Sequence, residues 1–564
     1  MSSKMVFDMV FHLIGGLGIF LFGMKSMSDG LQAIAGGALR RLIALVTNNR
    51  VMAVIAGIGV TCLVQSSSIT TVMAVGFVNS GFMMLNQAMG VILGANIGTT
   101  VTGWILVLKV GKYGLPILGI GIFFYLFSKN EKIKYVALTV LGIGMIFFGL
   151  ELMKNGFKPL RGMEEFRNWF LAFNSDTYLG VLKTAAVGCL LTVIVQSSSA
   201  TLGITIGLAQ TGLIGFETAA ALVLGENIGT TITAYLSSIG ASTNAKRAAY
   251  FHVFFNVIGV LIITALFSFY LPLVRWIMAL SGVSDISLMV MKDGIETYPY
   301  ITSGIATVHT VFNVANTLIF FPFLPAIATF LNRIVKEKIP QKKRLLTNLD
   351  FQMYESSFAA VEQSRFEIEK LSLQTQSMFE TLEIFLEGGK NRRKAADEIF
   401  ERENIIDEVQ KEITEFLTHA KGHNLGHDLN MECTRYLLLA DEFESISDYI
   451  MAIVKLYLRL EEHELEFTTD QKQALEKIHK RVKAFYAHSS EVNQIKDLKD
   501  FYQKTMIIRD GIINEIKTFR REHWEFLSKK PGDPLLGTTF TDLLVSYRKI
   551  NSHIGHMVET YVDE

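Results

Sequence analysis

The stretch Gln65-Ser66-Ser67-Ser68 decides the fold, because it lies in strongly apolar sequence and occurs twice. The second copy, Gln196-Ser197-Ser198-Ser199, follows 131 positions later. In the same register, Gly94-Ala95-Asn96-Ile97-Gly98-Thr99-Thr100 is matched by Gly225-Glu226-Asn227-Ile228-Gly229-Thr230-Thr231. Hydrocarbon penalises hydroxyls and amides that lack partners, so polar tracts at fixed places in two halves of a membrane protein indicate a site near the bilayer midplane.

The repeat extends upstream of the polar motifs. Gly18-Ile19-Phe20-Leu21-Phe22-Gly23 is similar to Gly144-Met145-Ile146-Phe147-Phe148-Gly149, at an offset of 126 positions. Two copies of one ancestral unit are therefore expected over about residues 9–130 and 134–272. Repeats of this length are halves of a domain rather than units of a solenoid.

Composition divides the chain into two parts that the average hides. The net charge is +0 and 50% of the residues are hydrophobic. Charges are sparse up to about Leu331 and dense from Asn332 onward, and the border is the basic run 333–344. We therefore predict a transmembrane transport domain over 1–340 and a soluble domain over 341–564. Basic residues beside a membrane favour the cytoplasmic face, and no cleaved signal peptide is expected.

Full membrane spans need about 20 apolar residues. We predict them at about 9–25, 83–108, 113–128, 134–153, 213–238, 247–272 and 302–331. The apolar runs on either side of each Gln-Ser-Ser-Ser are shorter, at 51–64 and 69–80 and again at 179–195 and 200–211. At 1.5 Å per residue, each of the first two reaches only about 20 Å, short of a core of about 30 Å. Each motif is therefore predicted to be the tip of a re-entrant hairpin.

Each repeat then crosses the membrane an odd number of times, so the second copy is inserted upside down. The predicted fold is an all-α polytopic membrane protein with two inverted repeats, each with a re-entrant hairpin, followed by a soluble helical-bundle domain. Inverted repeats of this kind are typical of secondary transporters. Seven crossings and an inner C-terminus place the N-terminus outside, and the positive-inside rule agrees.

The motif suits an anion and a cation together. Three hydroxyls at a hairpin tip can donate to an anion or accept a cation, and helix N-termini add free N–H groups. The apolar half has almost no lysine or arginine at membrane depth. A bound anion would need co-bound cations, and amide, hydroxyl and carbonyl oxygens are suited to sodium.

Several of these groups could also have a purely structural role. A single Ser/Thr run in a membrane helix usually supports helix packing, with its hydroxyls bonded to its own helix or to a neighbouring one. Two copies in register argue against that interpretation. His252/Asn256 and His309/Asn313 each share a helix face at i, i+4, and could be packing groups or supporting site residues. Glu226 replaces Ala95 in the repeated motif, and an intramembrane carboxylate indicates a cation ligand or a proton carrier.

These motifs resemble the type II sodium–phosphate cotransporter family over about residues 9–331. The resemblance implies that the two hairpins meet near the midplane and hold inorganic phosphate with sodium ions close by. The phosphate ligands it implies are Gln65, Ser66, Ser67, Ser68, Gln196, Ser197, Ser198 and Ser199. The sodium ligands it implies are Gln65, Ser68, Asn96, Thr99, Thr100, Gln196, Ser199, Glu226, Asn227, Thr230 and Thr231. In that family an Asp often follows the histidine, but here Val253 and Thr310 stand there, which leaves the number of sodium ions open.

The pattern of apolar and charged residues in the tail predicts six amphipathic helices. We predict them at about 350–386, 391–420, 428–463, 468–493, 495–529 and 537–561, forming two three-helix bundles. Its acidic motifs, Glu403-x-x-x-Asp407 and Ala440-Asp441-Glu442-x-Glu444-x-x-x-Asp448, resemble those of PhoU-like domains. The resemblance implies a divalent metal held by Glu403, Asp407, Glu444 and Asp448. A solvated acidic face is the alternative. In the second bundle the matching positions are Met506/Asp510 and Ser552/His556, which weakens the case for metal there.

The prediction that follows is a sodium-driven importer of inorganic phosphate in the plasma (inner) membrane, with a cytoplasmic regulatory tail. A phosphate sensor that signals through the tail is the alternative. An enzyme is disfavoured, because the membrane half has no His or Cys nucleophile with a paired base. The expected partners are phosphate, sodium and the lipid bilayer, with a homodimer as one option for the assembly. No basic stripe for nucleic acid is present.

Overall fold

The computed structural model describes residues 3–45, 49–79, 83–108, 113–162, 177–239, 241–292, 295–336, 347, 349, 357–421, 427–492, 495, 497–529 and 533–562. The chain forms two compact units, Met1–Ile339 with Gln352–Ala359 and Pro340–Phe351 with Ala360–Glu564. We call the first the membrane unit and the second the tail unit. The predicted domain border at 340 lies outside the described residues.

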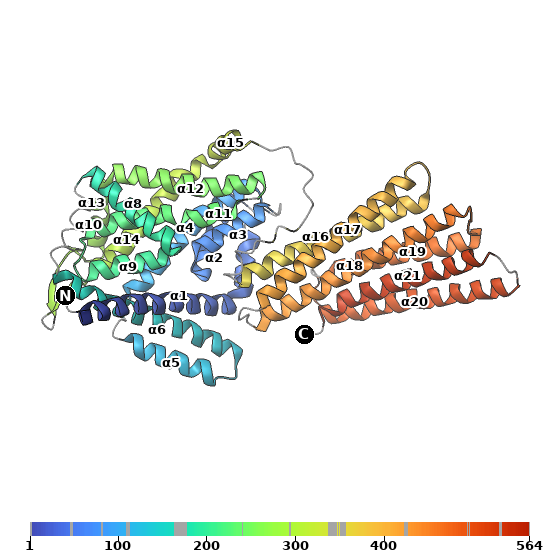
Figure 1. The fold of residues 1–564 in the computed structure, drawn as a ribbon, viewed down its shortest axis with the longest axis horizontal. Helices are drawn as coiled ribbons and strands as arrows, with labels where there is room; N and C mark the ends of the chain where they lie inside the picture. Colours follow the sequence, from blue (N-terminus) through green and yellow to red (C-terminus); the bar gives the residue numbers. More distant parts are fainter. Residues whose placement is uncertain are drawn as a thin grey trace. The chain divides into compact units, whose positions relative to one another are not determined.

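The membrane unit is built from helices and one short β-hairpin (Figure 1). Its helices are α1 Ser3–Leu45, α2 Arg50–Val64, α3 Ser67–Asn79, α4 Leu85–Val107, α5 Gly114–Phe127, α6 Glu131–Phe157, η2 Lys158–Gly162, α8 Tyr178–Val195, α9 Ser198–Gln210, α10 Phe216–Gly229, α11 Thr231–Ser237, α12 Thr243–Ala265, α13 Phe267–Leu280, α14 Ile301–Phe320, η3 Phe321–Phe323 and α15 Leu324–Ile334. Strands β1 Val290–Lys292 and β2 Ile295–Thr297 pair antiparallel.

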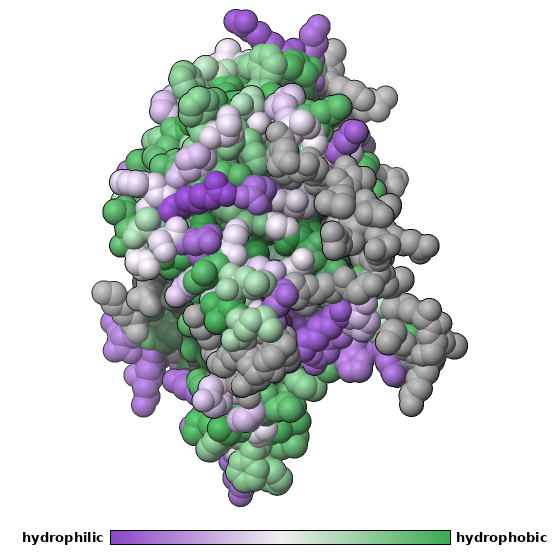
Figure 2. All heavy atoms as spheres, turned by 90° about the vertical axis from the view of Figure 1, so that its left-hand side faces the viewer, coloured by the Kyte–Doolittle hydropathy of each residue, from purple (hydrophilic) through white to green (hydrophobic). Residues whose placement is uncertain are grey.

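Within the described ranges, six helical stretches are long and apolar enough to cross a membrane. They are Val6–Ala35, Leu85–Val107, Glu131–Leu160, Tyr178–Val195, Thr243–Ala265 and Ile301–Ile334. Large apolar side chains such as Phe11, Phe127 and Phe269 are exposed on the outside of this unit. Figure 2 shows broad hydrophobic areas on one face of the molecule, interrupted by hydrophilic side chains. Exposed apolar surface of this extent fits a unit whose solvent is lipid, and the chain is a multi-pass membrane protein.

The two copies of the repeat are visible as matched sets of helices. Helices α2, α3 and α4 of the first copy correspond to α8, α9 and α10–α11 of the second. Figure 1 shows α2 and α3 toward one end of the membrane unit and α8 and α9 toward the other. Each pair turns back on itself at its Gln-Ser-Ser-Ser, and α1 packs along α6. The predicted inverted repeats, with a helical hairpin in each copy, are therefore confirmed.

The structure differs from the predicted spans in which segments are long enough and at several ends. Helix α5, predicted as a span at 113–128, has 14 residues and is not among the six, whereas α8, predicted as a short hairpin arm, is among them. Helix α1 continues to Leu45 rather than ending near residue 25, because its glycines do not stop a helix that packs along α6. The predicted span 213–238 is interrupted at Thr230. The predicted span 247–272 ends at Ala265, where Leu266 leaves helical geometry with ψ of 16° and a separate helix, α13, begins.

The tail unit contains six long helices, close to those predicted. They are α16 Ser357–Glu387, α17 Arg392–Lys421, α18 His427–Glu462, α19 Thr469–Ser490, α20 Leu498–Lys529 and α21 Pro534–Glu559. One hydrophobic core includes side chains from all six, among them Phe385, Ile399, Ile450, Ile478, Ile512 and Tyr547. Helix α18 contacts both α17 and α21, and the predicted division into two three-helix bundles stays a prediction. The predicted start at residue 350 lies outside the described residues.

Candidate functional site

The two hairpin tips have the same backbone geometry. Gln65 ends α2 with φ 56° and ψ 23°, and Gln196 ends α8 with the same two angles. Their backbone N–H groups donate to the carbonyls of Thr61 and Thr192, both at 2.7 Å. A non-glycine residue in the left-handed region is strained by about 1–3 kcal/mol and persists where the surroundings over-determine it. Strain at the same place in both copies marks the tips as candidate site positions.

A pair of threonines fastens the two half-helices of each hairpin. The Thr61 hydroxyl donates to the Thr70 hydroxyl at 2.9 Å, and Thr192 donates to Thr201 at 3.1 Å. The second threonine of each pair then donates to the carbonyl of the first serine, at 3.1 Å in both hairpins. Thr61 and Thr192 were not among the predicted site residues, although they also stand 131 positions apart. These bonds hold the tips in place.

The serines of each motif have different structural roles. The Ser66 hydroxyl accepts from the Ile69 N–H at 3.3 Å, and the Ser197 hydroxyl accepts from the Ala200 N–H at 3.2 Å. The first serine is thus an N-cap, and the next two lie in the first turn of the outgoing half-helix. A first turn also leaves backbone N–H groups without helical partners. Each tip therefore gathers hydroxyls and N–H donors.

The glycines that precede and interrupt Asn-Ile-Gly-Thr-Thr are close-packing positions. A Cβ at Gly94 would overlap the Val54 carbonyl of α2, and a Cβ at Gly225 would overlap the Ala185 carbonyl of α8. The missing side chain lets α4 and α10 lie directly against the incoming half of each hairpin. The motif is thus tightly packed, with a continuous helix in the first copy and a break at Thr230 in the second.

The four motif threonines each donate to a backbone carbonyl three or four residues earlier in the chain. The bonds are Thr99 to Ala95 at 3.0 Å, Thr100 to Ile97 at 2.8 Å, Thr230 to Glu226 at 2.9 Å and Thr231 to Ile228 at 2.8 Å. Asn227 likewise donates to Val223 at 2.8 Å. A hydroxyl that donates its proton keeps lone pairs for a cation, so sodium ligation by these residues stays a prediction.

The two glutamines differ although their backbones match. The Gln65 side chain is buried, accepts from the Thr102 hydroxyl at 3.2 Å and donates to the Cys62 carbonyl at 2.5 Å. The Gln196 side chain is exposed and has no hydrogen-bond partner among the described residues. Thr233, which corresponds to Thr102, instead donates to the Thr230 carbonyl at 3.1 Å, because α10 breaks there. We call the first tip closed, because its glutamine side chain is buried and hydrogen-bonded, and the second tip open, because its glutamine side chain is exposed.

Helix α12 brings the first His/Asn pair to the first copy. Asn96 donates to the Asn256 side-chain oxygen at 2.8 Å, and Asn256 donates to the His252 carbonyl at 3.0 Å. The His252 ring is fully buried, and neither of its nitrogens has a hydrogen-bond partner in the described part of the chain. Asn96, Asn256 and His252 therefore lie in one buried polar group.

Helix α14 brings the second His/Asn pair to the second copy. Glu226 is fully buried, and neither carboxylate oxygen has a hydrogen-bond partner among the described residues. His309 Nε2 lies 3.7 Å from one of these oxygens, too far for a hydrogen bond. Asn313 donates to the His309 carbonyl at 2.9 Å. Because a lone carboxylate is costly to bury, Glu226 needs a cation or a proton.

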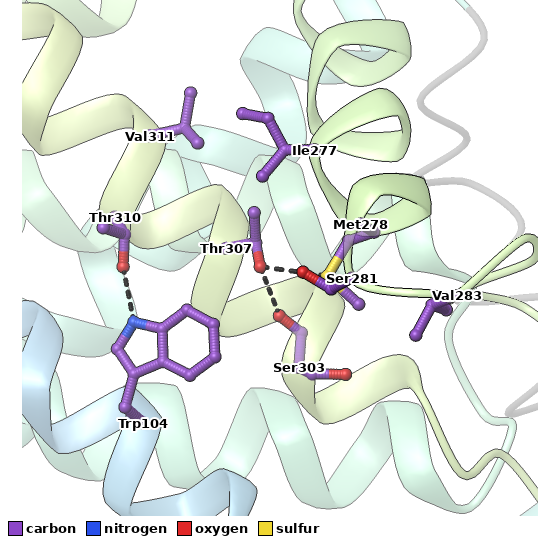
Figure 3. A pocket seen from close by; sticks show the side chains of 9 residues that line it. All are labelled: Trp104, Ile277, Met278, Ser281, Val283, Ser303, Thr307, Thr310 and Val311. Atoms are coloured by element: carbon purple, nitrogen blue, oxygen red, sulfur yellow. Dashed lines mark hydrogen bonds between the residues drawn. The ribbon is translucent and has the colours of Figure 1, made fainter.

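A separate cavity of about 240 Å³ lies between α4, α13 and α14 (Figure 3). The Trp104 ring N–H donates to the Thr310 hydroxyl at 2.9 Å, and the Thr307 hydroxyl donates to the Ser303 carbonyl at 2.8 Å. The cavity is lined by Trp104, Ile277, Met278, Ser281, Val283, Ser303, Thr307, Thr310 and Val311. None of the predicted site residues is in this lining.

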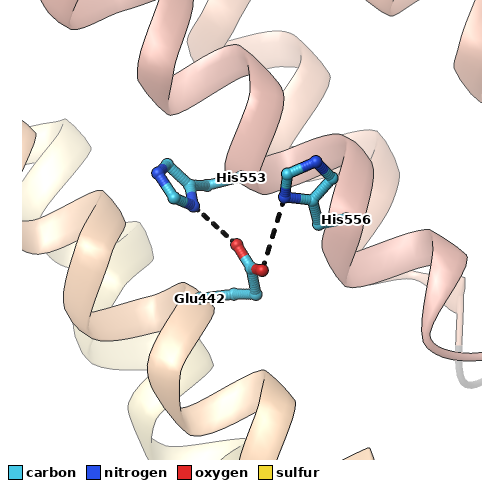
Figure 4. A group of neighbouring side chains, drawn as sticks. All are labelled: Glu442, His553 and His556. Carbon is cyan, nitrogen blue, oxygen red and sulfur yellow. Dashed lines mark hydrogen bonds and ion pairs between the residues drawn. The ribbon is translucent and has the colours of Figure 1, made fainter.

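The predicted acidic residues of the tail do gather. Burial, and then the neighbouring Asp448 carboxylate, raises the pKa of Glu403 to about 7. Burial, then Asp448 and Asp407, raise the pKa of Glu444. A different group nearby, Glu442 with His553 and His556, brings its ligand atoms within 4.8 Å of one another (Figure 4). Metal binding by the predicted four acids stays a prediction.

Comparison with known proteins bears on both units. The family model described as Na+/Pi-cotransporter matches residues 19–155 and again 156–293, and the PhoU domain model matches residues 368–456. The first model thus matches twice in the membrane unit, once for each copy of the repeat. No solved structure matches the chain significantly.

Relatives from bacteria and a mammal are similar to parts of the chain. YjbB of Salmonella typhimurium, named as a candidate inorganic phosphate export protein, is 26% identical over 440 residues, which are 78% of this chain and 76% of YjbB. The uncharacterised YqeW of Bacillus subtilis is 32% identical over 244 residues, 43% of this chain and 78% of YqeW. Sodium-dependent phosphate transport protein 2A of Rattus norvegicus is 37% identical over 99 residues, 17% and 15% of the two chains. Two matched copies, paired re-entrant hairpins and these relatives show that the chain belongs to the Na+/Pi-cotransporter family, with a PhoU domain in its tail.

Proposed function

We propose that this protein is a sodium-coupled secondary transporter that imports inorganic phosphate when the sodium gradient points inward. The observation that supports it most is the pair of hairpin tips with identical backbone angles at Gln65 and Gln196. Two tips that enter from opposite ends give a site that each side of the membrane can reach in turn, as alternating access requires.

Phosphate would be held by the donors at the tips. Ser67 and Ser68 in one hairpin, and Ser198 and Ser199 in the other, lie in helix first turns that also offer backbone N–H groups. Such turns favour anions through both hydrogen bonds and the helix dipole. The serine hydroxyls would fix the position of the anion, and the backbone N–H groups would stabilise its negative charge.

Sodium would supply the positive charge that the protein lacks at this depth. In the described part of the membrane unit, Arg247 is the one buried lysine or arginine, and it donates to the Val335 carbonyl near the start of α12. Glu226 adds a buried negative charge of its own. Co-bound sodium would therefore offset both the phosphate and the carboxylate, with Asn227 and the motif threonines as neighbouring oxygen ligands.

The orientation follows from the basic residues. Arg50 begins α2, the α5–α6 turn contains Lys129 and precedes Lys132, and Lys246 lies in the first turn of α12. The alternating direction of these helices brings the three positions to one end of the membrane unit, and lysine and arginine favour the cytoplasmic side. We place the tail unit on that side of the plasma membrane.

The test is uptake of radiolabelled phosphate into proteoliposomes that contain the purified full-length protein. We expect uptake when sodium is high outside, and at least about a tenfold lower rate when potassium replaces it. Equal uptake in potassium would contradict sodium coupling. Vesicles preloaded with phosphate test the opposite direction, which the name of YjbB favours. Efflux that needs no sodium gradient would replace import with export.

A second candidate function is phosphate sensing through the tail, and the PhoU domain match favours it. A sensor would bind phosphate at the same tips without carrying it across the membrane. Phosphate binding to the detergent-solubilised protein, combined with no transport in either direction, would support the sensor. Transport in either direction would rule it out as the sole function.

A further inference from the structure

The outgoing half-helix of each hairpin ends in an amide side chain that bonds to another helix. Helix α3 ends at Asn79 and α9 ends at Gln210, and these two residues stand 131 positions apart, as the tips do. The Asn79 side-chain oxygen accepts from the Ser242 backbone N–H at 2.7 Å. The Gln210 side-chain amide donates to the Thr302 hydroxyl, also at 2.7 Å. We call these two hydrogen bonds the end bonds.

Each end bond joins a hairpin to the start of the helix that carries its His/Asn pair. Ser242 is the N-cap of α12, and Thr302 is the second residue of α14. Helix α3 also packs against α12, and α9 packs against α14. The two partners are 163 positions apart in the first copy and 92 in the second, so neither bond follows from local sequence. The same connection is thus made twice, by different parts of the chain.

In the first copy, the end bond completes a path from the tip to a buried polar group. Asn79 is 12 residues beyond Ser67, which is about 18 Å along a helix at 1.5 Å per residue. From Ser242, helix α12 leads to Asn256, whose side chain is hydrogen-bonded to Asn96 of α4. The end bond is therefore remote from the tip, but it belongs to the frame that holds the tip and the polar group together.

The second copy repeats this path with different residues. Gln210 is also 12 residues beyond Ser198, and from Thr302 helix α14 leads to His309, which lies beside Glu226 of α10. The buried polar groups at the far ends of the two paths differ, because one contains a carboxylate and the other an asparagine pair. What the two copies share is the connection between each hairpin and its His/Asn helix.

We propose that Asn79 and Gln210 are positioning residues, whose end bonds make each hairpin and its His/Asn helix move together when the site changes sides. This inference rests on the transport function proposed above, in which one group of helices moves against another. A hairpin that moved alone would break its end bond and separate its tip from the buried polar group in every cycle. Movement of the hairpin with its helix keeps both sets of polar side chains around the transported ions.

The competing explanation is that the end bonds only stabilise the fold. Phosphate uptake per folded protein in proteoliposomes and phosphate affinity by calorimetry separate the two. Gln210→Leu and Thr302→Val each remove one side of the second end bond. We expect each to lower the maximal uptake rate about threefold to tenfold, as the loss of one hydrogen bond would, while phosphate affinity stays within about twofold of the parent's. The double variant should lose no more than either single variant, because both remove the same bond.

Cross-linking tests the movement itself. In a full-length chain whose three cysteines are replaced by alanine, Gln210→Cys with Thr302→Cys, and Asn79→Cys with Ser242→Cys, place thiols at the two end bonds. A short thiol cross-linker should join each pair equally well with and without sodium and phosphate. The cross-link should also restore the uptake rate that the substitutions lowered. Gln210→Cys with Ser242→Cys is the matched control, which should not cross-link because it combines the hairpin of one copy with the helix that serves the other.

The outcomes that would overturn the proposal are distinct from failure of the transport function. Cross-links that stop uptake, or a cross-linking yield that falls when sodium and phosphate are added, would show that a hairpin leaves its helix. Unchanged uptake in Gln210→Leu and Thr302→Val would show that the end bond does not affect the cycle. A parent chain that takes up no phosphate would instead contradict the proposed transport, while the cross-linking yield would still report whether each hairpin stays with its helix.

Discussion

The first and second hairpins have the same backbone geometry at their tips and differ in the surroundings of their polar side chains. Both glutamines have φ 56°, and both hairpins are fastened by a threonine pair. Yet Gln65 is buried and hydrogen-bonded to Thr102, whereas Gln196 is exposed. The second copy also carries a buried carboxylate, Glu226, where the first has alanine. The repeat thus preserves the scaffold that presents the tips, while the polar side chains have diverged.

Substitution of the close-packed glycines tests the shared packing of each copy. Gly94→Val and Gly225→Val should each destabilise the protein by about 1–3 kcal/mol or more, because a side chain would collide with a backbone carbonyl of α2 or α8. Thermal unfolding in detergent measures the effect. Gly119→Val is the control, since nothing lies within 4 Å of a Cβ placed there. A large loss in one copy and none in the other would show that the packing is not equivalent.

Glu226 is the buried carboxylate that the second copy has and the first copy lacks, so its removal tests the difference between them. Glu226→Gln keeps the shape of the side chain but removes its charge, so we expect sodium affinity to fall at least about tenfold, which corresponds to about 1.4 kcal/mol. The measurement is the phosphate uptake rate as a function of sodium concentration. Glu217→Gln, on the same helix but paired with Arg275 at the surface, should leave the curve unchanged. A Glu226→Gln curve that superimposes on the parent's would make the carboxylate structural.

The Gln65 side chain of the closed tip accepts a hydrogen bond from Thr102 that the Gln196 side chain of the open tip lacks. Thr102→Val removes the donor to Gln65 and should cost about 0.5–1.5 kcal/mol of stability. Thr233→Val removes only a bond within its own helix region and should cost less. Thermal unfolding of the two variants side by side gives the comparison. Equal losses would mean that Gln65 is not held closed by Thr102.

The sequence predicted the scaffold better than the details of the site. The apolar runs on both sides of each motif were enough to predict the hairpins, although α8 is longer than the other three arms and is itself long enough to be a candidate span. The left-handed glutamines were not predictable, since no glycine marks them. The Thr61–Thr70 bond could have been suspected from the shared register. The Glu442–His553 contact joins residues 111 positions apart, and only tertiary packing brings them together.

The break at Thr230 shows a different limit. Asn-Ile-Gly-Thr-Thr is identical in both copies, yet α4 is continuous and α10 ends at Gly229. An identical local sequence cannot by itself predict two outcomes. The substitution of Ala95 by Glu226 accompanies the difference, and so do the polar neighbours: Asn96 is bonded to Asn256 of α12, whereas Glu226 lies beside His309 of α14.

The central claim is that both tips serve one phosphate site, and binding stoichiometry tests it most directly. Calorimetric titration of the purified protein with phosphate in sodium buffer should give one phosphate per chain. Ser68→Ala and Ser199→Ala should each weaken that binding at least about tenfold without changing the stoichiometry. Two phosphates per chain in the parent, or full affinity in either variant, would contradict a single site shared by the two hairpins.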